Sequence, residues 1–219
     1  MNVDDISPDV IPTDFSELDR LDLIFIRQHQ LFEKYVVIEQ RNNLRHTVDC
    51  PVDINDRHGQ AQLKDFFWRV TEELTESAQA RIDHPDLDVH ALEELADTLH
   101  FLVEALLLAG LTPNDVWPDA EGKVEDKLVA LCGNERPEQF EEGCYRVIHS
   151  IGCASNCLKQ RPWKNTHQLT DRHKFEMHLI QAMHELIPLF CWYGCTPDDI
   201  FRMYWLKSEV NKFRQRSNY

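Results

Sequence analysis

The stretch Asp88-Val-His-Ala-Leu-Glu-Glu-Leu-Ala-Asp-Thr-Leu-His-Phe-Leu-Val-Glu-Ala-Leu-Leu-Leu-Ala109 decides the fold. Its leucines recur at intervals of three and four residues, and this spacing predicts one amphipathic helix from about Asp88 to Ala109. Gly110 follows directly, and glycine commonly ends a helix in this position. The most apolar part, residues 99–111, is interrupted by Glu104 and is too short to span a bilayer.

The rest of the chain has the same helical character. Seven Gly, ten Pro and few alternating Val, Ile and Thr runs favour an all-α helical bundle. We expect a first helix that starts near Ser16, a second over about 60–82 and a last one from Pro197, with a connector at 42–59. With 219 residues, 42% of them hydrophobic, the chain is long enough for a single all-α domain over 1–219.

Composition excludes some partners. The formal charge of −15 argues against duplex DNA and anionic membranes, because basic surfaces bind both. The first residues lack a basic segment followed by an apolar one, so we expect a cytoplasmic protein, in the host cytoplasm if it is encoded by a phage. Seven cysteines are then expected to remain thiols. Pairs at 153/157 and 191/195 have helical spacing, which leaves a zinc site as the less favoured alternative.

Two pairs of acids are candidates for a metal site. Glu73 and Glu76 are spaced i,i+3, as are Glu94 and Asp97, so each pair lies on one face of its helix. Hard oxygen ligands suit Mg²⁺, or Mn²⁺, better than Zn²⁺. A solvated acidic face is the alternative for either pair alone. Both pairs border apolar stripes, however, where carboxylates need a cation to offset desolvation and mutual repulsion.

A capped turn occurs twice. Residues 110–117, Gly-Leu-Thr-Pro-Asn-Asp-Val-Trp, recur at 194–201 as Gly-Cys-Thr-Pro-Asp-Asp-Ile-Phe. Each copy stops one helix and starts another with Thr as N-cap and Pro in the first position. The match extends backwards, because Trp68-Arg-Val resembles Tyr145-Arg-Val. We interpret this as an internal duplication; two well-capped helical hairpins could also look alike by chance.

The duplication predicts two related helical halves of one domain. The half over 60–131 would bind the metal, and the half over 140–219 would be degenerate and carry a C-terminal substrate-binding segment. In the second half, the positions of the four acids are occupied by Ser150, Cys153, His178 and Gln181.

The acids and the C-terminus resemble a known family. Glu-x-x-Glu, seventeen intervening residues and Glu-x-x-Asp is similar to the pattern of the all-α nucleoside triphosphate pyrophosphohydrolases, which include MazG-like enzymes and dimeric dUTPases. The segment Tyr204 to Tyr219 resembles the ending of dimeric dUTPases and of phage-type dCTP/dUTP pyrophosphatases, with departures at Ser208 and Asn218. Asn tolerates left-handed backbone, so the second departure is mild. The resemblance implies a MazG/dimeric-dUTPase-like fold and a homodimer; a duplicated chain could instead supply a pseudo-dimer by itself.

The resemblance also suggests substrate contacts. Gln28 is similar to the base-facing Gln of the family's first helix, and Trp68 to the Trp that precedes its first acidic pair, although an aromatic at this spacing is more often core. Lys207, Asn211 and Arg214 would share a helix face able to hold phosphate oxygens; alternatively they are an ordinary basic helix end. Tyr219 would close over the sugar or base.

These residues predict a Mg²⁺-dependent enzyme that cleaves dUTP and/or dCTP to the monophosphate and pyrophosphate. Glu73, or Glu72 beside it, would assist the attacking water. The amide of Gln28 offers a donor and an acceptor, so the choice between uracil and cytosine stays open. A MazG-like pyrophosphatase of broad nucleotide range and a non-catalytic helical adaptor are the alternatives.

Overall fold

The structure is a computed structural model that describes residues 5–84, 88–118, 126–160 and 168–217. Within these ranges the chain forms α-helices and connecting segments without a strand, so the predicted all-α class is confirmed. The elements are the 3₁₀ helix η2 (Pro8–Val10), α1 (Arg20–Arg41), α2 (Arg57–Asp83), α3 (Asp88–Ala109), α4 (Pro113–Val116), α5 (Lys127–Cys132), α6 (Phe140–Cys157), α7 (Arg172–Trp192) and α8 (Pro197–Ser217).

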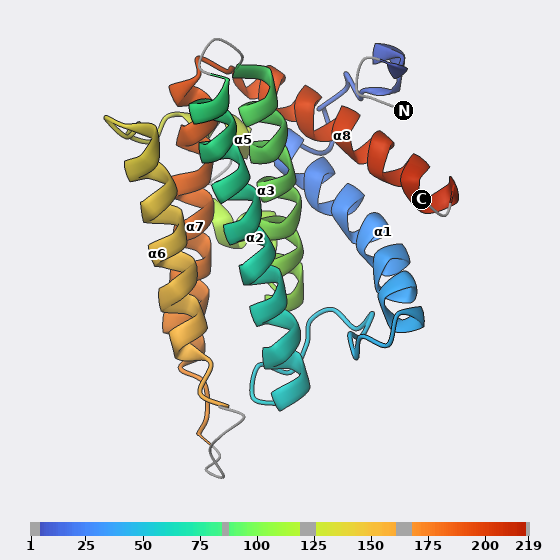
Figure 1. The fold of residues 1–219 in the computed structure, drawn as a ribbon, viewed down its shortest axis with the longest axis vertical. Coiled ribbons are helices and arrows are strands. Elements are labelled where there is room, and N and C mark those ends of the chain that lie inside the picture. Colours follow the sequence, from blue (N-terminus) through green and yellow to red (C-terminus); the bar gives the residue numbers. More distant parts are fainter. Residues whose placement is uncertain (1–4, 85–87, 119–125, 161–167, 218–219) are drawn as a thin grey trace.

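Two helical hairpins form the centre of the molecule. In Figure 1, α2 and α3 run antiparallel beside the pair α6 and α7. The remaining long helices, α1 and α8, contact each other and α3 on the opposite side. The leucine stripe of α3 faces this interior, where Leu95, Leu99, Leu102 and Leu106 are fully buried. Burial of such a stripe against helices on both sides is the main stabilising contribution to the bundle.

Helix starts follow the strongest local caps. The first helix begins at Arg20 and not near Ser16, because Asp19 and Asp22 form a reciprocal capping box there. The second begins at Arg57, three residues earlier than predicted, because the side chain of Asp56 accepts hydrogen bonds from the first turn. The predicted bounds of α3 and the start of α8 at Pro197 are confirmed.

The repeated turn has the same geometry in both places. Gly110 and Gly194 each adopt a φ of 83°, a conformation that residues with a Cβ rarely adopt. Beyond each glycine, the hydroxyl and amide of a threonine donate to an aspartate three residues later, at 2.7 and 2.8 Å in Thr112–Asp115 and at 2.6 and 2.9 Å in Thr196–Asp199. The agreement supports two related halves, and the duplication itself stays a prediction.

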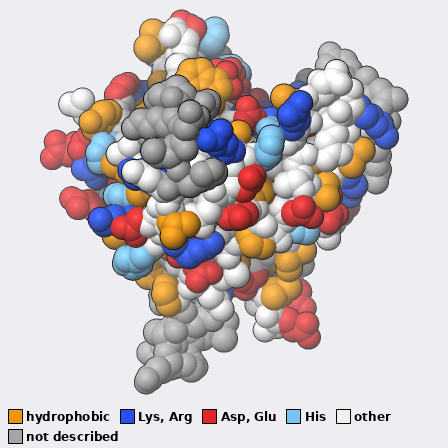
Figure 2. Space-filling view, turned by 90° about the horizontal axis from the view of Figure 1, so that it is seen from below, with side chains coloured by type: hydrophobic (Ala, Val, Ile, Leu, Met, Phe, Trp, Pro, Cys, Tyr) orange, Lys and Arg blue, Asp and Glu red, His pale blue; other side chains and the backbone are white. Residues whose placement is uncertain are grey.

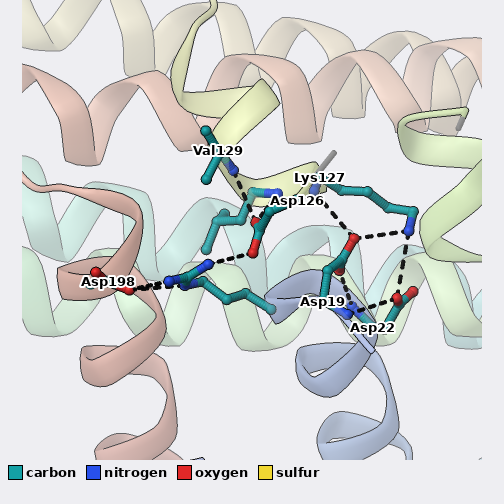
Figure 3. Close-up of polar contacts among 8 residues, drawn as sticks. Asp19, Asp22, Asp126, Lys127, Val129 and Asp198 are labelled. Carbon is teal, nitrogen blue, oxygen red and sulfur yellow. Dashed lines mark hydrogen bonds and ion pairs between the residues drawn. The ribbon is translucent and has the colours of Figure 1, made fainter. Parts of the chain in front are cut away.

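Ion pairs join the start of α1 to α5 and α8, and the Lys127–Asp19 pair among them is buried. Figure 3 shows Lys127 reaching Asp19 and Asp22, with Nζ–Oδ2 distances of 2.9 and 3.5 Å. Arg20 bridges Asp126 and Asp198 in the same region. Removing one partner of a buried pair leaves an uncompensated charge, so this network holds α1 at a defined position over α3.

The surface is mixed in charge. On the face seen in Figure 2, acidic and basic side chains of the described residues are interspersed, and the basic ones do not form a continuous patch. All seven cysteines are free thiols, as predicted. In the described part of the chain, none of the helices is long and apolar enough to cross a membrane.

Candidate active site

Helices α1, α2, α3 and α8 enclose a cavity of about 240 Å³. Acidic and basic side chains line one part of it, and buried polar and aromatic side chains line another. The lining residues are Gln28, Leu31 and Tyr35 from α1, Arg69 and Glu73 from α2, Asp97, His100, Phe101 and Glu104 from α3, and Asn211 and Arg214 from α8. A concave site with a few convergent polar groups is typical of small-molecule binding.

Three of the four predicted acids form a cluster. One carboxylate oxygen from each of Glu73, Glu76 and Glu94 lies within 4.8 Å of the others, although Glu73 and Glu76 come from α2 and Glu94 from α3. Burial, together with repulsion from Asp97, Glu94 and Glu76, raises the pKa of Glu73 to about 8. Burial also raises the pKa of Glu94. The cluster therefore carries more negative charge than the protein around it compensates.

The fourth acid has a cationic partner. Asp97 lies on the same face of α3 as Glu94, and Lys207 Nζ is 2.9 Å from its Oδ2. Burial raises the pKa of Asp97, while Lys207, Arg214 and a hydrogen bond from Asn211 act against that rise. Helix α8 thus presents the three predicted phosphate-binding side chains to the acidic side of the cavity, as their spacing of three and four residues suggests.

A hydrogen-bonded network forms another wall of the cavity. Gln28 Nε2 donates to Glu104 Oε1 at 2.8 Å, and Gln28 Oε1 accepts from the Tyr204 hydroxyl and lies against His100 Nδ1. The His100 ring stacks on Tyr204 with centroids 4.1 Å apart, and burial lowers the pKa of His100 to about 3, so the imidazole is neutral. Burial raises the pKa of Glu104 to about 8.

Other predicted residues lie elsewhere. Trp68 is 62% exposed and is not among the residues that line the cavity, and Glu72 is exposed beside Glu73. Ser208 is fully buried and accepts a hydrogen bond from Arg27 Nε at 2.9 Å, which accounts for a small hydroxyl at this position. Tyr219 lies outside the described residues.

Sequence reasoning missed Arg69, His100 and Glu104, which line the cavity, and Tyr204, which donates a hydrogen bond to the lining residue Gln28. One signal was present, because Glu104 interrupts the most apolar run of the chain. A carboxyl in such a run is expected to be buried, and buried charged groups need a specific partner or a function. The positions of the other three depend on how α1 and α8 cover α3, and no local pattern encodes this.

In the second half, the place that the predicted duplication aligns with the acidic cluster has a hydrogen-bonded network around a single acid, Glu185. Ser150 Oγ donates to Glu185 Oε2 at 2.7 Å, and Gln181 Nε2 donates to Glu185 Oε1 at 3.1 Å. Ser150 and Gln181 are the aligned counterparts of Glu73 and Asp97. They approach each other across α6 and α7 as those acids do across α2 and α3. The candidate metal site is therefore confined to the first half among the described residues.

A family model described as dUTPase matches residues 81–219, which is more than half of the chain. The chain belongs to this dUTPase family. The matched region contains Glu94, Asp97 and the C-terminal helix, and the other helices of the acidic cavity, α1 and most of α2, precede it. Membership confirms the resemblance to the all-α pyrophosphohydrolases and implies a hydrolase that acts on phosphoric anhydrides of nucleotides. Comparisons with curated proteins and with solved structures gave no match.

Proposed function

We propose that the protein is a Mg²⁺-dependent pyrophosphohydrolase that cleaves dUTP and/or dCTP to the nucleoside monophosphate and pyrophosphate. The observation that supports this most is the set of side chains that line one cavity. Its wall joins the carboxyl groups of Glu73 and Asp97 to Asn211 and Arg214, with Lys207 beside them, and continues to the buried hydrogen-bonding groups around Gln28. A triphosphate needs both cations and metal-binding acids, and a nucleobase needs hydrogen-bond partners in a dry pocket.

The acidic residues fit a divalent cation. Their ligand atoms are carboxylate oxygens from two facing helices, the donor type that Mg²⁺ and Mn²⁺ prefer. Burial, and after it repulsion from the neighbouring acids, raises the pKa of Glu73, and a bound cation would offset both effects. We assign Glu73, Glu76, Glu94 and Asp97 as the residues that would hold the metal. When bound, the cation would neutralise the acids and the phosphate oxygens and favour the ionised form of Glu73.

The side chains of this protein then have distinct tasks. Lys207, Asn211 and Arg214 would hold the phosphate oxygens, and Lys207 would exchange its partner Asp97 for phosphate when the substrate binds. Glu73 lines the cavity and would take the proton of the water that attacks phosphorus. Glu72 is exposed and would act only through Glu73. Trp68 and Tyr219 stay proposed substrate contacts, Trp68 through its exposed ring.

The experiment is a panel of dUTP, dCTP, dTTP, dATP and dGTP with Mg²⁺, read out as pyrophosphate release. Glu73→Gln and Asp97→Asn should each lower kcat/KM by about 100-fold or more, because each removes a charge from the site. Glu185→Gln, a substitution of the same type in the second half, is the matched control and should keep activity. Full activity in both site variants, or release of orthophosphate alone, would contradict the proposal. Similar efficiency on purine and pyrimidine triphosphates would favour a pyrophosphatase of broad nucleotide range. The absence of turnover with every triphosphate would favour a non-catalytic helical adaptor.

We also propose a homodimer. An apolar groove between α1 and the end of α3, lined by Phe25, Ile26, Leu107, Leu111 and Pro113, is open to solvent, and the side chain of Ile26 is 45% exposed. Exposed apolar surface of this kind commonly marks an interface. Sedimentation velocity should give twice the chain mass of 25.8 kDa. A monomer at micromolar concentration would instead support a pseudo-dimer within one chain.

A further inference from the structure

Glu104 lines the cavity but is not one of the four acids assigned to the metal site. It is 2% exposed, lies two helical turns beyond Asp97 on α3, and still lines the cavity. Within the protein it accepts one hydrogen bond, from Gln28 Nε2 at 2.8 Å. A buried carboxyl that lines a ligand cavity is therefore a candidate for contact with the ligand.

The surroundings of Glu104 keep it uncharged. Arg69, the cation on the neighbouring helix, is already paired with Glu39 and Asp65 at 2.6 and 2.7 Å. Burial raises the pKa of Glu104 to about 8, so the acid form predominates at neutral pH. The titratable groups that face it are Tyr35 and Glu39 from α1, Cys50 before α2, Arg69 from α2, His100 from α3 and Tyr204 from α8. Burial raises the pKa of Tyr35, Cys50 and Tyr204, so these three stay neutral.

The internal hydrogen bonds of Gln28 define which group of Glu104 is left for a ligand. Gln28 is 2% exposed, and both ends of its amide are engaged within the protein, with Tyr204 and His100 on one side and Glu104 on the other. Because Gln28 Nε2 donates to Glu104 Oε1, that oxygen acts as an acceptor. In an uncharged carboxylic acid the other oxygen then carries the proton and is a donor.

We propose that Glu104, as a neutral carboxylic acid, is a specificity-determining residue that donates a hydrogen bond to the carbonyl at ring position 4 of the nucleobase, with Gln28 as the residue that positions it. The inference rests on the proposed function, because it takes the cavity as the nucleotide site. Uracil carries a carbonyl oxygen at ring position 4, whereas cytosine carries an amino group there. A donor facing an amino group leaves both groups unpaired in a buried site, so the arrangement favours uracil.

Three variants separate this role from a structural one. In Glu104→Gln, the amide has the same pattern of one acceptor and one donor as the neutral acid, but it cannot ionise. Glu104→Leu removes both groups at similar volume. Glu185→Gln serves as the control for a half-buried, hydrogen-bonded glutamate outside the cavity. For each protein, kcat and KM are measured for dUTP and dCTP between pH 6.5 and 9.5, and binding of dUMP and dCMP is measured by calorimetry.

We expect the wild-type protein to favour dUTP over dCTP by at least tenfold at pH 7, mainly through KM. Glu104→Leu should lose about 10- to 100-fold in kcat/KM for dUTP and most of the preference. Glu104→Gln should retain the preference and keep it at high pH, whereas the wild-type preference should decline above about pH 8, where Glu104 ionises. The control should behave as wild type throughout.

Several outcomes would overturn the inference. An unchanged dUTP/dCTP ratio in Glu104→Leu, or a wild-type preference for dCTP that Glu104→Gln reverses, would show that Glu104 is not a neutral donor to the base. Should Glu104→Leu fail to fold, the pH profiles of wild type and Glu104→Gln decide the question, and identical profiles count against the proposal. If no protein hydrolyses a triphosphate but dUMP binding follows the expected order, the proposed function fails while the base-reading role of Glu104 stands.

Discussion

Replacing Glu73 by Gln should stabilise the metal-free protein. The pKa of Glu73 rises from 4.5 to about 8 in the folded state because of burial and repulsion from the neighbouring acids. A raised carboxyl pKa means that the folded state binds the proton more tightly than the unfolded state. The resulting loss of stability is absent below pH 4.5, grows as pH rises to about 8, and is constant above that value.

The magnitude follows from that pH window. Each pH unit between the two pKa values lowers the free energy of unfolding by about 1.4 kcal/mol. Between pH 4.5 and pH 7 the loss adds up to about 3 kcal/mol without screening. Glu73 is only partly buried and shares its charge with Glu76 and Glu94, so solvent reduces this to about 1–2 kcal/mol. For a chain of this size, Glu73→Gln should then raise the thermal midpoint by about 2–8 °C in the presence of a chelator.

Thermal unfolding with EDTA and with Mg²⁺ is the assay. A hundredfold excess of Mg²⁺ over its Kd should stabilise the wild-type protein by about 2.7 kcal/mol and the variant by clearly less. Glu185→Gln is the matched control; its carboxylate accepts two hydrogen bonds, so replacing it should not stabilise the protein. The reasoning is refuted if Glu73→Gln in EDTA is no more stable than wild type from pH 6 to 8, or if Mg²⁺ shifts both proteins equally.

Three further predictions concern stability and turnover. Lys127→Met should lower the free energy of unfolding by about 3 kcal/mol in chemical denaturation, because its carboxylate partners stay buried. Gly194→Ala should cost about 1–2 kcal/mol through its φ of 83° alone, and Gly110→Ala more, since its Cβ would meet a proline Cβ at 3.0 Å; equal losses would contradict this. Lys207→Met should reduce turnover about 100-fold yet retain Mg²⁺-dependent stabilisation. Retained stabilisation would show that Asp97 still holds the metal without its lysine partner.

Most of the fold could be predicted because its signals are local. The periodicity of α3 and the glycine that ends it gave the bounds of that helix, and the Thr-Pro turn gave the start of α8. The start of α1 was placed too early because Ser16 and Asp19 are both acceptable caps in sequence. Each also has an acid three residues later, but the reciprocal capping box forms between Asp19 and Asp22, and Asp19 pairs in addition with Lys127 on α5.

The candidate site was predictable to the extent that it lies on single helices. Spacing of three residues identified the acids of α2 and α3, and the structure brings Glu73, Glu76 and Glu94 together. The pairing of Asp97 with Lys207 joins residues more than 100 positions apart, and so does the link between Gln28 and Tyr204. Such contacts depend on the docking of α1 and α8 over α3, which periodicity does not determine.

The two hairpins divide stability and function between them. In the first, burial and repulsion between acids on α2 and α3 raise the pKa of Glu73, and the proposed cation would offset that repulsion. In the second, Ser150 and Gln181 satisfy the single acid Glu185, so α6 and α7 pack without a comparable electrostatic cost. Because α2 packs on α6 and α3 on α7, the second hairpin supports the first directly. Placing acids at those two positions should therefore destabilise the protein without creating a second active site, since Lys207 of α8 pairs with Asp97 in the first hairpin.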